Sequence, residues 1–192
     1  MTRVIDRGAI TGAWVGVGVA VTLGLSFLLI IPIDPIYYLL ALPAGLLIGY
    51  YANTKADRRN GPWVRILANG LFAGLVTGIA LAAFLLAVKA IFFYADTGYP
   101  NFNRIDQNGA TIPPACDNGA GCAWARYDAQ YGPELRAAGI ADAPSFERYY
   151  WQQQIAAGLT LVLVALAGGL GGAALYGTSR PKATPATPPT TG

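Results

Sequence analysis

The strongest constraint on the fold is a series of long apolar runs, at about residues 9–33, 36–52, 65–94 and 152–177. A helix needs about 20 predominantly apolar residues to cross the hydrocarbon core of a bilayer. Three of the runs exceed that length, and the run at 36–52 lies near the lower limit. The chain is also 54% apolar and only 12% charged, about half the charged share of a soluble protein. The sequence therefore predicts an all-α membrane protein, a four-transmembrane-helix bundle.

The second run contains Pro43 at its centre. Proline removes a backbone donor and kinks a helix, and neighbouring helices accommodate this defect within a membrane. We expect a kinked crossing at 36–52. A re-entrant segment is the alternative for this run.

Basic residues in the short connecting segments predict the orientation of the chain. Lys and Arg accumulate on the cytoplasmic side of short loops. With four crossings, the N-terminal segment, the basic loop 53–65 and the Pro/Thr-rich tail 178–192 all lie on one side, and the loop 95–151 lies on the other. We therefore expect cytoplasmic termini, a disordered tail and an extracytoplasmic loop subdomain at 95–151, in the cell membrane. The basic residues concerned are Arg3, Arg7, Lys55, Arg58, Arg59, Arg65, Arg180 and Lys182.

Small residues recur every four positions within the apolar runs. Lipid tails supply no hydrophobic drive for helix association, so close backbone approach between small residues has to hold helices together. We expect these rows to pack helices within the bundle, and a row that faces another subunit is the alternative. The clearest rows are Gly12, Gly16, Ala20 and Gly24 in the first run and Gly70, Gly74, Gly78 and Ala82 in the third; weaker rows are Ala41, Gly45 and Gly49, and Ala165, Gly169, Ala173 and Gly177.

Two residues, Asn69 and Lys89, are candidates for a polar site within the membrane. Lys89 falls near the outer boundary, where a long stem carries the ammonium to the headgroups; an ion pair with an outer-loop acid and a transport role are the alternatives. Hydroxyls such as that of Thr77 can bond across helices or to their own backbone. No acid lies deep in any run, which disfavours a proton- or cation-coupled carrier.

The loop 95–151 contains both cysteines, Cys116 and Cys122, around a short Gly-rich segment. In an oxidising compartment this spacing predicts a disulfide. A metal site is the weaker interpretation, because the chain has no histidine and no third cysteine to complete it. We therefore expect neither a metal nor a cofactor.

Downstream of the cysteines, the sequence predicts one or two short helices that break at Gly132 and Pro133. Asp142 is a predicted N-cap with Pro144 in the first turn, and that helix is expected to run into the fourth span. Three carboxylates of the loop, Asp128, Glu134 and Glu147, have no fixed spacing and are expected to be solvated surface groups.

The residues outside the spans contain no nucleophile, base and metal constellation, so we expect no enzyme. The net charge of +3 is too small to indicate nucleic acid. The partners we expect are the lipid bilayer and either a membrane protein or further copies of the chain. The sequence is most consistent with a non-enzymatic accessory or scaffolding subunit that packs against partner helices through its Gly/Ala rows. A small-molecule transporter or channel acting as an oligomer is the alternative.

We predict that reporter tags on the two termini are modified from the same side of the membrane, and that the purified chain stays monodisperse only in detergent or lipid. Membrane-impermeant labelling of each tag in intact and opened cells measures the first, and size-exclusion chromatography the second. Labelling of the two tags from opposite faces would contradict the four-crossing arrangement.

Overall fold

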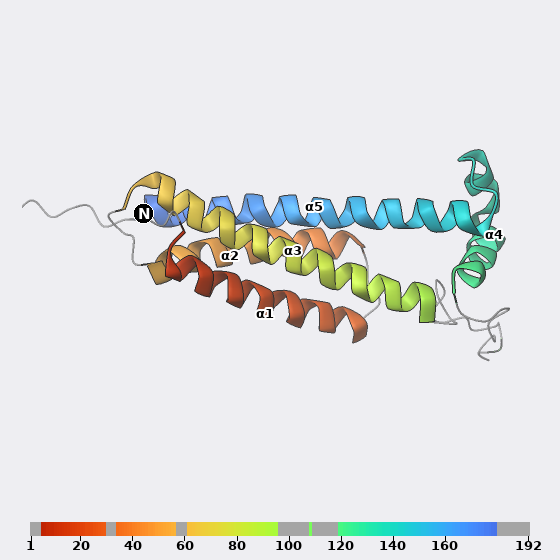
Figure 1. The fold of residues 1–192 in the computed structure, drawn as a ribbon, viewed down its shortest axis with the longest axis horizontal. Coiled ribbons are helices and arrows are strands. Elements are labelled where there is room, and N and C mark those ends of the chain that lie inside the picture. Colours follow the sequence, from red (N-terminus) through yellow and green to blue (C-terminus); the bar gives the residue numbers. More distant parts are fainter. Residues whose placement is uncertain (1–4, 30–33, 57–60, 96–107, 109–118, 180–192) are drawn as a thin grey trace, which may run out of the picture.

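The computed structural model describes residues 5–29, 34–56, 61–95, 108 and 119–179. These residues form helices and no strand. In Figure 1 the long helices α1, α2, α3 and α5 lie side by side, and α4 lies across one end, which we call the α4 end. The opposite end, where α1 begins and α5 finishes, is the termini end. The helices are α1 (Arg7–Leu29), α2 (Asp34–Ala56), α3 (Trp63–Ala95), α4 (Ala120–Ala137) and α5 (Ala143–Thr178).

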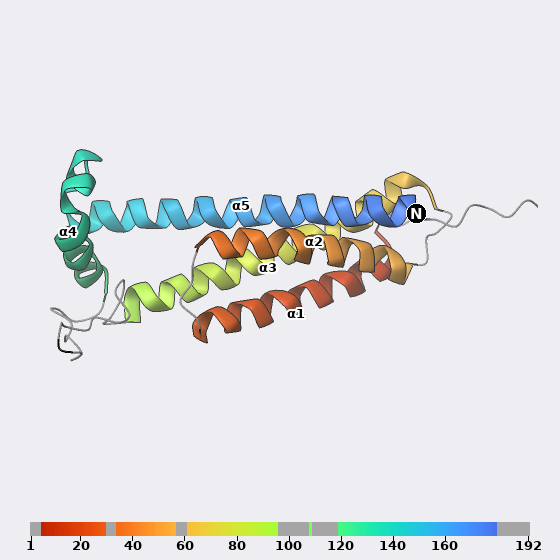
Figure 2. The ribbon, with the colours of Figure 1, turned by 180° about the vertical axis from the view of Figure 1, so that it is seen from behind.

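The four long helices alternate in direction along the bundle. Helices α1 and α3 run toward the α4 end, whereas α2 and α5 run away from it (Figures 1 and 2). Helix α5 packs against α2 and α3, and α1 packs on the other side against the same two helices without reaching α5. One face of α1 is therefore left outside the bundle.

Three of the helices are long and apolar enough to cross a membrane: α1 over Arg7–Ser26, α3 and α5. They mark a membrane-embedded protein. Helix α2 is not among the three, so the predicted count of four crossings is supported for three helices only. Its apolarity is diluted by the paired tyrosines Tyr50 and Tyr51, by Pro43, through which the helix continues, and by Asn53.

Helices α2 and α5 meet at their backbones through glycines. A methyl group at Gly45 or Gly49 of α2 would collide with the carbonyl oxygen of Ala165 or Gly169 in α5. In the reverse direction, a methyl group at Gly172 of α5 would collide with the carbonyl oxygen of Leu46. Only glycine permits this separation, because any Cβ would have to occupy the space of a neighbouring peptide group.

Helix α3 packs as closely on a second row of α5. A methyl group at Gly74 would lie 2.9 Å from the Ala165 oxygen, and one at Gly70 would lie 2.5 Å from the Cβ of Ala173. Helix α5 therefore places Gly168 and Gly172 against α2 and Ala173 against α3, whereas Ala165 and Gly169 lie against both helices.

The row on α1 faces α2 and α3. A methyl group at Gly12 would lie 2.8 Å from the Cβ of Ala52, one at Gly16 would meet the Thr77 hydroxyl, and one at Gly24 would lie 3.1 Å from the Cβ of Phe84. All eight small residues of the two clearest predicted rows are buried in the chain itself.

The hydroxyl residues of the long helices bond mainly to their own helices. The side chains of Thr22, Ser26 and Thr77 donate to carbonyl oxygens four residues earlier, at distances of 3.0, 2.8 and 2.8 Å. Of the two predicted options, backbone bonding within the helix is the one observed.

We predict that Gly172→Leu lowers the free energy of unfolding by about 1–3 kcal/mol or more, because backbone atoms of α2 would have to move. The matched control is Gly171→Leu: the neighbouring glycine has no atom within 4 Å of an added Cβ, so this variant keeps or slightly raises stability through better helix propensity. Thermal unfolding in one detergent, followed by circular dichroism, compares the two. Equal midpoints would contradict the backbone contact.

Candidate functional site

A closed polar cluster lies at the termini end, formed by Asp6, Asn53 and Asn69. The Asn69 Oδ1 accepts from the Asp6 amide at 3.1 Å, and its Nδ2 donates to the Asp6 carboxylate at 3.0 Å and to the Asn53 Oδ1 at 3.4 Å. The Asn53 Nδ2 in turn donates to the carbonyl oxygens of Gly49 and Ile66, each at 3.0 Å. Both asparagine side chains are fully buried.

This cluster ties the segment before α1 to α2 and α3. Buried amides are costly when unsatisfied, and here each amide finds partners on another element. Sequence reasoning named Asn69 but missed Asn53 and Asp6, because their partners lie up to 63 positions away along the chain. The arrangement joins α2, α3 and the segment before α1.

Two further predicted site residues, Lys89 and Cys122, lie toward the α4 end. Lys89 is only 7% exposed and is covered by the chain itself; that its ammonium reaches the headgroups stays a prediction. Cys122 is buried near the start of α4. Cys116 lies outside the described residues, so the disulfide also stays a prediction.

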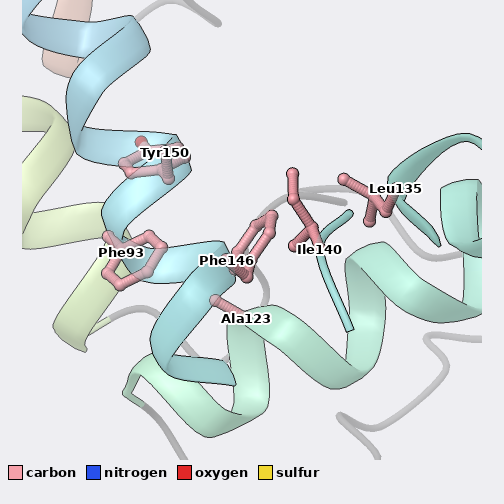
Figure 3. Close-up of a cluster of buried hydrophobic side chains, with 6 residues drawn as sticks. All are labelled: Phe93, Ala123, Leu135, Ile140, Phe146 and Tyr150. Carbon is pink, nitrogen blue, oxygen red and sulfur yellow. The ribbon is translucent and has the colours of Figure 1, made fainter. Parts of the chain in front are cut away.

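An aromatic cluster fixes α4 to the ends of α3 and α5. It consists of Phe93, Ala123, Leu135, Ile140, Phe146 and Tyr150, and Figure 3 shows Phe146 between Phe93 and Tyr150 on one side and Ile140 on the other. The rings of Phe93 and Tyr150 stack with centroids 4.5 Å apart, and Phe93 and Phe146 are each 1% exposed. Stacked aromatic pairs add about 0.5–1.5 kcal/mol beyond the area they bury.

A second contact beside this cluster joins α3 to α5. The Tyr94 hydroxyl donates to the Glu147 carboxylate, and the Trp151 Nε1 donates to the Tyr94 oxygen at 3.0 Å. The rings of Tyr94 and Trp151 stack at 6.0 Å. Because α3 and α5 are held here as well as in the bundle, α4 has a fixed position on them.

The predicted start of α5 is confirmed. Asp142 is the N-cap, its carboxylate accepts from the Ser145 amide at 2.8 Å, and Pro144 lies in the first turn. The hydrogen bonds from the Ser145 side chain and backbone hold the pKa of the Asp142 carboxyl below its usual value. Helix α5 then continues without interruption to Thr178, so it spans the predicted boundary between the loop subdomain and the fourth span.

Helix α4 has the predicted break, one position before the predicted Gly132. The non-helical residue is Tyr131 (φ −127°, ψ 19°), and Pro133 follows within the second part of the helix. The three loop carboxylates do not converge: Asp128 pairs with Arg136 at 2.6 Å, Glu147 binds Tyr94, and Glu134 lines a groove. Among the described residues, no three His, Cys, Asp or Glu side chains gather to hold a metal.

The groove that Glu134 lines has a mixed polar and aromatic lining. It lies between α4 and α5 and has a volume of about 340 Å³. Sequence reasoning missed it, because its walls come from two helices whose crossing the sequence does not encode locally. Its lining residues are Tyr127, Tyr131, Glu134, Leu135, Ala138, Phe146, Tyr149, Tyr150, Gln153 and Gln154.

The fold and these clusters define the class of the protein as a membrane-embedded helical bundle with an aromatic helical unit at one end. Comparison with known proteins places it in no family: no protein-family model, no curated protein and no solved structure matches the chain.

We predict that the first turn of α5 loosens as the pH falls through the lowered pKa of Asp142. The stabilisation from its carboxylate is complete above the ordinary pKa of an aspartate and is lost once the group is protonated. Hydrogen exchange at the Ser145 and Phe146 amides, corrected for intrinsic rates, measures this. Asp142→Ala should show fast exchange at neutral pH, and Asp142→Asn, which also caps helices, should remove the pH dependence while keeping protection.

Proposed function

We propose that all four long helices cross the membrane and that the protein acts as a non-enzymatic accessory or scaffolding subunit. Support for a crossing by α2 comes from its packing against α1, α3 and α5, each apolar enough to cross. Its 23 residues extend about 35 Å, which exceeds the hydrocarbon thickness of about 30 Å. A helix packed against three crossing neighbours over this length shares their depth.

The proposed orientation places the termini end in the cytoplasm and the α4 end outside the cell membrane. Arg7, Lys55 and Arg65 belong to the helix ends that meet at the termini end, in agreement with the preference of basic residues for the cytoplasmic side. Helices α3 and α5, with 33 and 36 residues, measure about 50 and 54 Å. They extend beyond the membrane and carry α4, with Cys116 and Cys122 forming the proposed disulfide there.

The observation that carries the accessory role is the closed interior of the bundle. The Gly and Ala rows of α2, α3 and α5 are occupied by one another, with backbone in contact with backbone. This packing gives no support to a solute path through a single chain. We therefore assign the function to the outer surfaces of the bundle. The interior Gly and Ala rows stabilise the fold of the chain itself.

The surface we assign to a partner helix is the outward face of α1. Gly18 is exposed there with no atom within 4 Å of an added Cβ, in a shallow groove with Val15, Val19, Thr22 and Leu23. Trp14 is 72% exposed on the same helix. An open glycine on a lipid-facing helix allows a second helix to approach closely, as the interior glycines do within the chain.

We predict that Gly18→Leu abolishes association with the partner, whether another membrane protein or a second copy, without unfolding the bundle. Gly171→Leu, at the comparably open glycine of α5, is the matched control and should retain it. Native mass spectrometry of the chain purified from its own membranes in mild detergent measures the stoichiometric complex, and thermal unfolding checks the fold.

Two outcomes would contradict the accessory role. One is a complex that survives Gly18→Leu as well as it survives the control. The other is solute flux in liposomes that contain the pure chain, which would favour the transporter or channel alternative with a path between copies. Leucine at Gly74 or Gly78 does not test either alternative, because those glycines hold the chain's own α3 against α5.

A further inference from the structure

The groove between α4 and α5 combines a wall of aromatic rings with one acid. Four tyrosines and one phenylalanine line it, together with a single carboxylate, that of Glu134, and no lysine or arginine. Arg136, two positions from Glu134, is held by Asp128 at 2.6 Å instead. Among the described residues Glu134 has no ion-pair partner. The groove therefore offers one negative charge and the accessible rings of Tyr131 and Tyr149.

The rings lie close enough to act on one ligand. Tyr127 and Tyr131 have ring centroids 6.1 Å apart, and Tyr127 lies 4.8 Å from Phe146, which lies 6.2 Å from Tyr150. Tyr131 and Tyr149 are 44% and 39% exposed, whereas Phe146 is buried at the floor. The site thus has a packed aromatic floor and two accessible tyrosines at its rim.

We propose that this groove binds a quaternary ammonium group. Such a cation carries its charge on an apolar surface, and aromatic rings attract it through cation–π interactions while a nearby carboxylate balances the charge. An anion finds no basic lining residue here. Hard metal ions favour sites with several carboxylate oxygens, and this groove has one carboxylate beside neutral tyrosine hydroxyls and two glutamine amides.

The position of the groove on α5 defines two sources for this group. Gln153 and Gln154 line it and directly precede Ile155, where the apolar part of α5 begins. The groove therefore lies at the depth of lipid headgroups, where the trimethylammonium of a phosphatidylcholine can enter, and it is also open to a soluble ligand such as choline. This inference requires membrane embedding of α5 but is independent of the partner surface on α1.

The test uses the full chain in nanodiscs of phosphatidylglycerol, which contain no choline, titrated with choline and with its neutral isostere 3,3-dimethylbutan-1-ol. Saturation-transfer NMR measures both affinities. We expect choline to bind at least about 5-fold more tightly than the isostere, since only the cation gains from the rings and from Glu134. Equal affinities, or no binding of choline, would overturn the proposal.

Variants separate the rings from the acid. Tyr131→Leu keeps an apolar side chain but removes the ring, and Glu134→Gln removes the charge; each should weaken choline binding about 2- to 30-fold. Tyr131→Phe retains the ring and should bind as the wild type does, which controls for misfolding of the leucine variant. Tyr51→Leu, at the termini end, is the matched tyrosine control. Unchanged affinity in both groove variants would also overturn the assignment.

A second bilayer identifies the source. In phosphatidylcholine nanodiscs, loss of the choline signal means that lipid headgroups occupy the groove, and an unchanged signal means that the site selects a soluble ligand. Either result is compatible with the shared chemistry. A negative result of the Gly18→Leu experiment would contradict the partner surface on α1 but would not change the choline-binding results. The two proposals are therefore tested independently.

Discussion

The contact on which this structure depends is the approach of α5 to two helices at once, with backbone against backbone at its glycines. Gly172 meets α2 and Gly169 meets α3 at the level of peptide groups. In lipid, where burial of apolar surface yields no gain, dispersion between closely packed backbones has to supply the cohesion. The cost of glycine in a helix is about 1 kcal/mol per residue relative to alanine in water, and the glycines of these two contacts are explained by the neighbouring backbone that they admit.

Helices α3 and α5 also position α4, which lies at the end of the bundle. Because α3 and α5 are longer than α1 and α2, their ends project together, and Phe93 from one and Tyr150 from the other form a stacked pair. Helix α4 packs on this pair through the aromatic cluster. The groove is thus built on rigid supports, where the lining rings are held by packing, although α4 itself is a short helix with a break.

Local patterns predicted the elements well and the contacts between them poorly. The helical runs, the Asp142 cap and the break near Pro133 follow from signals within a few residues, and all appear in the structure. The partner of each glycine row does not follow from local signals. The rows on α2 and α5 were the weaker ones in the sequence, and yet they form a backbone-to-backbone contact. Asn53 and Glu134 were missed as members of sites for the same reason: a cluster and a groove arise from the crossing of distant helices.

The role of α5 as the common neighbour of α2 and α3 bears on how the chain is made. During synthesis the N-terminal helices emerge first, so α1, α2 and α3 are made before α5. Until α5 arrives, Gly45, Gly49, Gly70 and Gly74 face lipid or any passing helix. The nascent protein therefore passes through a stage in which these glycines are uncovered, and α5, which is made after them, covers them.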